Sequence, residues 1–249
     1  MEFFGSHGLS LAPLSSPQRY IVMYLTPRSP RETGREYALR TIKDNIIRLE
    51  LAPGSFISEN ELAAEMGLSR TPVREALIDL AKVKIIEITP QKRSVVAPID
   101  YEMVEEARFM RNTLECAVVE LACHHAMASE IVHLEENVRL QRFHLEHSNY
   151  GGIMELDNQF HEMLFQIAQK SQVYAMIQQI SIHFDRVRSM ALTGVRDPKI
   201  VDDHAQIVQA LTDRDCQRAR TVMERHLNRY KLDEQAIRQA YPQYFAGNR

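Results

Sequence analysis

The fold is decided by residues 58–77, which read SENELAAEMGLSRTPVREAL. Ser58 can cap a helix while Glu61, three residues later, reaches back to it, which is the pattern of a capping box. That helix is expected to end at Gly67, because glycine takes the left-handed conformation of a helix C-terminus most easily. Only one residue separates it from Ser69, a favourable cap for another helix. Two short helices joined by so tight a turn predict a helix-turn-helix.

The second helix of this pair divides into two faces. Its apolar residues recur at helical spacing and are expected to face the core: Val73, Ala76, Leu77 and Leu80. Arg70, Thr71 and Arg74 then point away from that face. A helix N-terminus with free amides, two arginines and a hydroxyl suits phosphates and base edges, and arginine can bridge the two acceptors of guanine. The plain alternative is an ordinary solvated helix face.

The flanking segments complete a small domain over residues 31–99. Apolar residues at helical spacing predict a first helix over residues 35–51, stopped by a proline and a glycine. Residues 85–89 and 94–97 are typical of two strands joined by a short turn. The turn carries two basic residues, Lys92 and Arg93. We therefore expect a winged helix domain with a basic wing tip.

Residues 100–249 have a different character. Residues 31–99 contain 11 lysines and arginines against 10 aspartates and glutamates, whereas residues 100–249 contain 17 against 22 and hold nine of the ten histidines. Apolar residues at three- and four-residue spacing predict an all-helical bundle. Its expected helices cover residues 101–127, 129–147, 151–170, 173–192, 199–212 and 214–238. The boundary falls near Pro98, and residues 1–30 are expected to form a poorly ordered arm.

Four residues of the second part are of metal-ligating types. Asp157 and His161 are four residues apart and share one face of a predicted helix, while His204 and His226 lie on later predicted helices. Three imidazoles and a carboxylate suit zinc, and also manganese or nickel. The spacing alone leaves an alternative open, because each histidine can equally be a surface or a hydrogen-bonded core residue.

Composition excludes several other classes. The net charge of -3 argues against a uniformly basic nucleic-acid coat protein. No apolar run approaches the ~18 residues that a membrane span needs, and the first residues do not look like a signal peptide. Three cysteines give no disulfide framework and favour a reducing cytoplasm. Cys116 and Cys123 are expected in the core, and Cys216 has no visible partner.

Residues 61–77 closely resemble the GntR family of bacterial transcription regulators, and the resemblance covers all of residues 31–99. It implies a winged helix whose recognition helix enters the major groove of double-stranded DNA, while the wing tip reaches the minor groove. Five residues match positions of the family that contact DNA: Asn60, Ser69, Arg70, Thr71 and Arg74. The family usually has glycine in place of Lys84 and Arg93. We therefore expect Lys84 to need a backbone conformation that glycine adopts more easily.

Most of residues 100–235 look like the FCD effector domain, which defines the FadR-like branch of these regulators. The resemblance rests on residues 111–115, 157–161, 203–204 and 225–227. It implies a divalent metal held by Asp157, His161, His204 and His226, in members that mostly sense small organic acids. Arg111 matches the family as the partner of the acid's carboxylate. Arg188 is a second candidate, with a structural ion pair as its alternative role.

Together these features predict a homodimeric DNA-binding regulator controlled by a small carboxylate bound at the metal, because helix-turn-helix dimers bind two-fold half-sites. A second hypothesis keeps DNA binding but makes the metal structural, or makes the metal itself the signal. A third hypothesis, a metalloenzyme, is disfavoured because His161-Glu162 lacks the second histidine of an H-E-x-x-H motif.

Overall fold

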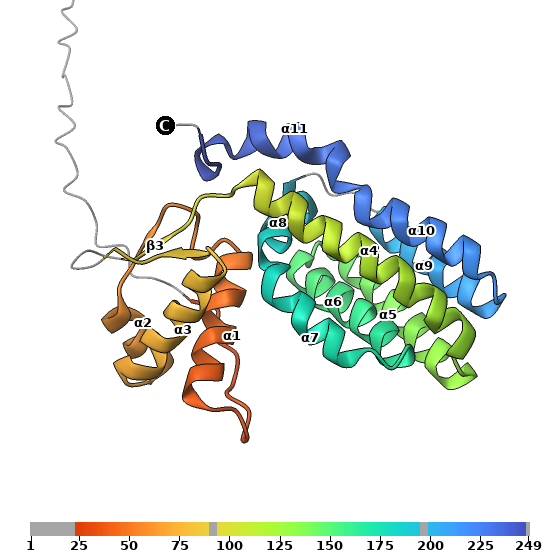
Figure 1. Cartoon of the computed structure of the whole chain (residues 1–249), viewed down its shortest axis with the longest axis horizontal. Helices are drawn as coiled ribbons and strands as arrows, with labels where there is room; N and C mark the ends of the chain where they lie inside the picture. Colours follow the sequence, from red (N-terminus) through yellow and green to blue (C-terminus); the bar gives the residue numbers. More distant parts are fainter. Residues whose placement is uncertain (1–22, 90–93, 195–198, 248–249) are drawn as a thin grey trace, which may run out of the picture.

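The computed structural model describes residues 23–89, 94–194 and 199–247. Within them the chain forms two parts that lie side by side (Figure 1): a small N-terminal part of helices and a sheet, and a larger part of helices alone. This is the mainly helical architecture that the sequence predicts, a winged helix-turn-helix followed by a bundle. No helix in these described ranges is long and apolar enough to cross a membrane. The expectations for Lys92, Arg93 and residues 1–22 lie outside the described residues.

The N-terminal part is a winged helix. Its elements are α1 (Gly34–Ile47), β1 (Phe56–Ile57), α2 (Glu59–Met66), α3 (Arg70–Lys82), β2 (Ile86–Glu87) and β3 (Ser94–Val96). α2 and α3 form the predicted helix-turn-helix, and Gly67 between them has a left-handed backbone at φ 64°. The predicted apolar face of α3 is buried. The sheet is antiparallel in the order β1-β3-β2, so the wing has one more strand than the sequence pattern predicts.

Two local predictions in this part are wrong. α1 ends at Ile47 rather than at residue 51, because Leu49 takes a left-handed conformation at φ 64° and the chain turns there to bury Leu51. Ser69 precedes α3, but its side chain makes no capping hydrogen bond in the described structure. Ser58 does cap its helix, because its hydroxyl oxygen accepts a hydrogen bond from the Glu61 amide at 3.4 Å.

The described end of the N-terminal arm is fixed to α1. The Tyr24 amide donates to the Asn45 side chain at 2.7 Å, and the Asn45 amide group donates to the Tyr24 carbonyl at 2.9 Å. Met23 is buried in the core of the winged helix, and the Arg48 guanidinium lies over the Tyr24 ring at 4.0 Å. Residues from Met23 onward therefore pack as part of this domain.

The C-terminal part is a helical bundle. It contains α4 (Tyr101–His125), α5 (Ala128–Glu146), α6 (Tyr150–Ile167), α7 (Ser171–Ile180), α8 (Ile182–Gly194), α9 (Lys199–Thr212), α10 (Cys216–Asn228), α11 (Tyr230–Ala240) and a short 3-10 turn at Pro242–Tyr244. α4 packs along α10 and α6, and α5 packs along α6 and α9. Two predicted helices are each two helices, with breaks at Ser181 and Arg229. Neither break contains proline or glycine, and the apolar periodicity continues across both, so the sequence does not predict them.

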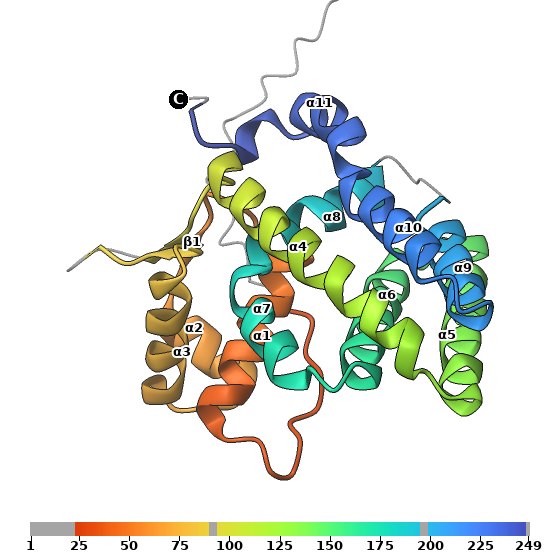
Figure 2. The same ribbon diagram turned by 45° about the vertical axis from the view of Figure 1, so that its right-hand side comes forward.

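Helix α8 joins the two parts, and Figure 2 shows α7 and α8 beside α1. Ile182 belongs to the apolar core of the winged helix. His183 donates from Nε2 to the carbonyl of Val83, at the C-terminal end of α3, at 2.7 Å. Arg186 is fully buried and donates to the carbonyl of Ala97 at 2.8 Å, and burial lowers the pKa of Arg186 to about 10. One helix of the bundle thus contacts both the recognition helix and the connecting segment.

The connecting segment, residues 97–100, is also held by the C-terminal tail. The Ile99 amide donates to the Tyr244 carbonyl at 2.7 Å, and the Ala246 amide donates to the Ile99 carbonyl at 2.9 Å. The Phe245 ring stacks on Tyr101 at the start of α4, with ring centroids 5.2 Å apart. Backbone pairing therefore fixes the joint between the two parts.

Candidate metal centre and DNA-binding surface

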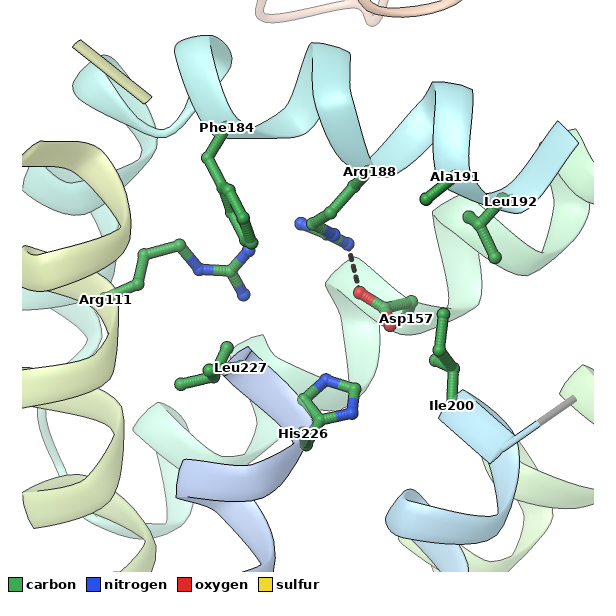
Figure 3. Close-up of a pocket in the computed structure, with 9 residues that line it drawn as sticks. All are labelled: Arg111, Asp157, Phe184, Arg188, Ala191, Leu192, Ile200, His226 and Leu227. Carbon is green, nitrogen blue, oxygen red and sulfur yellow. Dashed lines mark hydrogen bonds and ion pairs between the residues drawn. The ribbon is translucent and has the colours of Figure 1, made fainter. Parts of the chain in front are cut away.

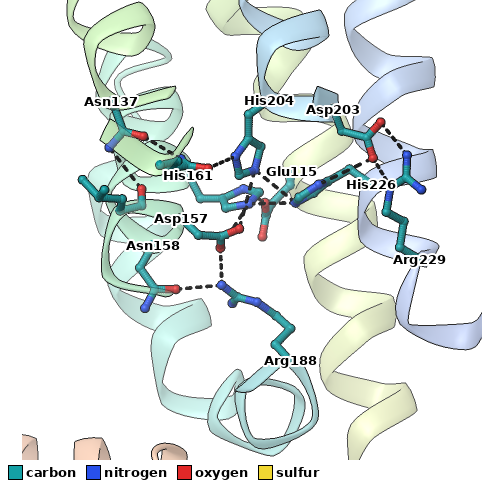
Figure 4. A network of polar contacts seen from close by, with 12 residues as sticks. Glu115, Asn137, Asp157, Asn158, His161, Arg188, Asp203, His204, His226 and Arg229 are labelled. Atoms are coloured by element: carbon teal, nitrogen blue, oxygen red, sulfur yellow. Dashed lines mark hydrogen bonds and ion pairs between the residues drawn. The ribbon is translucent and has the colours of Figure 1, made fainter. Parts of the chain in front are cut away.

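The four residues predicted as metal ligands converge in the centre of the bundle (Figure 4). Asp157 and His161 come from α6, His204 from α9 and His226 from α10. The Nε2 atom of His226 lies 3.2 Å from that of His161 and 3.3 Å from that of His204. The Asp157 carboxylate lies 3.6 Å from His204 Nε2 and 3.8 Å from His161 Nε2. The helices thus bring together residues that are far apart in the sequence.

These separations fit a single cation. Ligand nitrogens about 2.0–2.1 Å from one metal ion at tetrahedral angles are about 3.3–3.4 Å apart. His161 Nδ1 lies 2.5 Å from a carboxylate oxygen of Glu115, and His204 donates from Nδ1 to Gln141 at 2.8 Å. When both imidazoles are neutral with the proton on Nδ1, each Nε2 atom carries a lone pair. Such lone pairs repel one another when they are aimed at one point unless a cation lies between them. The donor set suits a divalent metal ion.

The outer partners of the three histidines were not predicted. Glu115 on α4 contacts His161, and Gln141 on α5 accepts the hydrogen bond from His204. Asp203 on α9 lies 4.0 Å from Nδ1 of His226 and is held by Arg225 at 2.6 Å. Oxygen atoms in such positions fix the tautomer and the orientation of ligating histidines. Sequence spacing gives no link between α4 or α5 and the ligands, so only the fold could identify Glu115 and Gln141.

Burial sets the charge state of the centre. Burial and the neighbouring His161 lower the pKa of His226 to about 3, and burial lowers the pKa of His204 well below its ordinary value. Burial alone would raise the pKa of Asp157, but Arg188 and the three histidines hold that pKa below its ordinary value. At neutral pH the centre therefore offers neutral imidazoles at His204 and His226 and an ionised carboxylate at Asp157, the forms that bind metal ions.

A small pocket lies beside this centre (Figure 3). Two ligands, two arginines and several apolar side chains line it: Arg111, Asp157, Phe184, Arg188, Ala191, Leu192, Ile200, His226 and Leu227. Its volume of about 40 Å³ accommodates only a few water-sized groups, at ~10–15 Å³ each. A pocket of this size that contains two arginines beside the candidate ligands Asp157 and His226 suits a small anion.

The two arginines predicted to bind an effector differ in their pairing. Arg111 donates from Nε to Glu115 at 2.6 Å, while its Nη1 has no hydrogen-bond partner among the described residues and lies 3.7 Å from Asp185. Arg188 donates to Asp185 at 2.7 Å and also pairs with the ligand Asp157. Arg188 thus makes structural ion pairs, which is the alternative role that the sequence predicts for it. Arg111, in contrast, has a donor in the pocket wall without a hydrogen-bond partner among the described residues.

The residues predicted to contact DNA lie together on the surface of the helix-turn-helix. Those within the described ranges are all exposed: Asn60, Ser69, Arg70, Thr71 and Arg74. Arg70 pairs with Glu59 at 3.1 Å, yet its side chain remains 67% exposed. Lys84, before the wing, has φ 58°, which confirms that this position needs a conformation favoured by glycine. Contact between these residues and DNA stays a prediction.

The cysteines correct one expectation. Cys116 and Cys123 are buried, as predicted. Cys216 was expected to lack a partner, but its Sγ lies 2.7 Å from Sγ of Cys123. The prediction is wrong because the contact joins the ends of α4 and α10, which no sequence spacing connects.

A winged helix with an exposed, arginine-bearing helix, joined to a helical bundle with a buried candidate metal centre, is typical of a class of DNA-binding regulators. The models for the bacterial regulatory proteins of the gntR family and for the FCD domain match residues 36–96 and 106–229. The chain is 32% identical over 222 residues to the HTH-type transcriptional repressor RspR of Escherichia coli K12, covering 89% of this chain and 97% of that protein. The chain therefore belongs to the GntR family, in the group that carries an FCD domain.

Two further comparisons agree. The chain is 34% identical over 216 residues to an HTH-type transcriptional regulator of Streptomyces ambofaciens, covering 86% of this chain and 90% of that protein. The solved structure of E. coli McbR/YncC has the same fold, with a TM-score of 0.73 at 19% identity over 84% of this chain and 99% of that chain. The chain is thus a DNA-binding transcription regulator rather than an enzyme.

Proposed function

We propose that this regulator senses a small carboxylate at a divalent metal ion held by Asp157, His161, His204 and His226, with zinc as the first candidate and manganese or nickel as the others. The observation that carries the proposal is Arg111, whose buried Nη1 is without a hydrogen-bond partner in the described structure and lines the pocket beside the ligands. A buried donor left unpaired costs free energy. A carboxylate would accept a hydrogen bond from this donor, because arginine and carboxylate match in geometry and charge.

The pocket restricts the class of effector. Its polar lining contains Arg111 and Arg188 together with the candidate ligands Asp157 and His226, and the remaining side chains are apolar. A short carboxylic acid with a small apolar portion fits this lining and the small volume. When bound, the metal would supply a Lewis-acidic contact for the acid. Arg111 would orient the carboxylate, and Arg188 would hold Asp157 in place.

Helix α8 supports a route from this pocket to DNA. Phe184 and Arg188 of α8 line the pocket, while His183 and Arg186 of the same helix bond to Val83 and to the connecting segment. A movement of α8 would therefore change the position of α3. Such a shift requires that the acid bind the DNA-competent and DNA-incompetent arrangements with different affinity.

The DNA-binding part of the proposal follows from the exposed surface of the helix-turn-helix. Asn60, Ser69, Arg70, Thr71 and Arg74 would contact double-stranded operator DNA in the major groove, and Lys92 and Arg93 would extend the contact at the wing tip. The regulator would act in the cytoplasm as a homodimer, because two recognition helices match the two-fold symmetry of an operator.

A thermal melt tests the effector proposal. The purified protein is melted with added zinc or with a chelator, against a panel of short mono- and dicarboxylates, each beside its neutral amide. A ligand at 100 times its Kd stabilises the folded state by about 2.7 kcal/mol, which raises Tm by roughly 5–10 °C. We expect one acid to do so only with metal present, and its amide to have no effect.

A substitution at Arg111 distinguishes carboxylate sensing from a purely structural role of the metal. Arg111→Lys keeps the charge but removes the planar pair of donors, so it should weaken the acid's effect on Tm and leave the zinc effect in place. Arg139→Ala, an exposed arginine on α5, is the matched control. If zinc raises Tm and no acid does, the metal is structural or is itself the signal, and the carboxylate proposal fails.

A further inference from the structure

Two cysteines meet at one end of the bundle, away from the metal centre. Cys123 lies in the last turn of α4 and Cys216 is the first residue of α10. Their Sγ atoms are 2.7 Å apart. A disulfide bond needs a separation of about 2.05 Å, so a small adjustment of the two side chains would bring the sulfur atoms to bonding distance.

The backbones on either side are already clamped together. Arg214, in the turn between α9 and α10, donates to the carbonyl of Cys123 at 2.6 Å and to the carbonyl of Ala126 at 2.5 Å. These are carbonyls at the C-terminal end of α4, where a cation also meets the negative end of the helix dipole. The turn itself is fixed by a left-handed backbone at Arg214, with φ 57°. The two helix ends therefore need no relative movement for their sulfurs to react.

The two sulfurs differ in accessibility. Cys123 is buried, whereas Cys216 is partly exposed. Both ring nitrogens of His124 lie 3.7 Å from Sγ of Cys216, close enough to accept its proton. Burial and the contact with Cys216 raise the pKa of Cys123 to about 12. Cys216 is therefore the sulfur that a dissolved oxidant reaches first, and Cys123 is the resolving thiol behind it.

We propose that Cys123 and Cys216 are a reversible oxidation site that forms an intramolecular disulfide in response to hydrogen peroxide. The Cys216 sulfur attacks the peroxide oxygen, breaks the O–O bond and becomes a sulfenic acid as water leaves. The Cys123 sulfur then attacks the sulfenic sulfur, its proton leaves with the hydroxyl group as a second water, and the S–S bond forms. Two thiols and hydrogen peroxide thus give one disulfide and two water molecules. A dithiol reductant reverses the reaction.

The bond would connect helices that build the metal centre. α4 carries Arg111 and Glu115, and α10 carries His226. A covalent link between them restrains the walls of the pocket and removes conformational freedom from the unfolded chain. Oxidation should therefore raise the Tm of the protein, by about 5 °C or more.

The test treats the reduced, full-length protein with hydrogen peroxide and maps its thiols by mass spectrometry. The expected product has lost two hydrogen atoms, contains a linked peptide pair with Cys123 and Cys216, runs as a single chain without reductant and melts at a higher temperature. Dithiothreitol should restore both the mass and the Tm. Cys116→Ala is the matched control, because Cys116 is buried in α4 with Asn112 as its sulfur contact at 3.7 Å; it should oxidise like the parent.

Two single variants make the result decisive. Cys216→Ser should leave the remaining cysteines unlinked, and Cys123→Ser should let Cys216 proceed to oxygenated or intermolecular products instead of the internal bond. The proposal is overturned if the parent protein gains only oxygen atoms, forms only intermolecular links, pairs through Cys116 or does not react. A parent disulfide that forms without any change in Tm would overturn the predicted restraint.

Discussion

The winged helix and the bundle present their candidate functional residues in opposite ways. On the winged helix, the candidate DNA contacts that lie within the described residues fall in residues 60–74, where they are exposed and close in sequence. In the bundle, the candidate metal ligands span residues 157–226, come from three helices and are almost completely buried. One site is a surface that a short segment displays, and the other is an interior that the whole bundle assembles.

Because of this difference, a substitution should affect binding alone in the winged helix but both binding and stability in the bundle. A substitution on the exposed face of α3 should remove a predicted contact with DNA and leave the core in place. A substitution among the buried ligands removes packing, hydrogen bonds and charge together, so its effects on function and stability are mixed. Each prediction below tests whether the two regions behave in these two ways.

The largest expected effect is the loss of metal from the assembled site. The double variant His161→Ala/His204→Ala should reduce bound metal from about one per chain to nearly none, because only two of the four ligands remain. Elemental analysis after dialysis measures this ratio. The matched control replaces two exposed histidines of the bundle, His125→Ala/His133→Ala, and should retain the metal. A double ligand variant that keeps stoichiometric metal would show that the site assignment is wrong.

The next effect is a loss of stability of the metal-free protein at acid pH. His204 and His226 have pKa values lowered in the folded state. Below about pH 6.5 the unfolded chain therefore binds more protons, and the free energy of unfolding decreases as pH falls. Two such histidines predict a loss of about 3–4 kcal/mol between pH 7 and pH 5. Denaturant unfolding of chelated protein measures it, and a flat profile would contradict the buried, neutral state.

The exposed surface should lose affinity without losing stability. Arg74→Ala is expected to weaken operator binding by about 10- to 100-fold, and to lower the salt dependence by about one counterion if the contact is to phosphate. Its Tm should stay close to that of the parent. Arg139→Ala carries the same charge change on the bundle and should bind DNA normally. Unchanged operator affinity and salt dependence for Arg74→Ala would reject the DNA-binding assignment.

The smallest effect concerns the backbone next to the wing. Lys84→Gly should raise the free energy of unfolding by about 0.5–1 kcal/mol, because Lys84 holds a left-handed backbone at φ 58° that glycine adopts with less strain. Lys82→Gly, two residues earlier within α3, should instead destabilise by about 1 kcal/mol. Equal effects of both glycines would show that the conformation of Lys84 carries no strain.

The same contrast explains what the sequence could predict. The helix-turn-helix is encoded by neighbouring caps, a glycine and an apolar face, so it and its exposed residues were identified from one short segment. Asp157 and His161 could be paired in the same way, because they share a helix face. His204 and His226 are candidates by residue type alone. Only the family resemblance links them to Asp157 and His161, since no local spacing connects them to α6.

Other features depended on the fold and were missed. Glu115 and Gln141 meet the ligands only because α4 and α5 pack around α6 and α9. Strand β1 is two residues long and exists through its pairing with β3, so it has no pattern of its own. The contact between Cys123 and Cys216 likewise depends on where two helices end.

The connecting segment between the two regions has a mechanical consequence. Ala97 receives a hydrogen bond from Arg186, and both backbone groups of Ile99 pair with the C-terminal tail. A segment with its polar groups so engaged is a stiff coupling and not a free tether. Torque applied by DNA to the winged helix would therefore be resisted by α8 and by the tail at once. Removing the tail would make that coupling more flexible while leaving the candidate DNA-binding surface and the candidate metal centre unaltered.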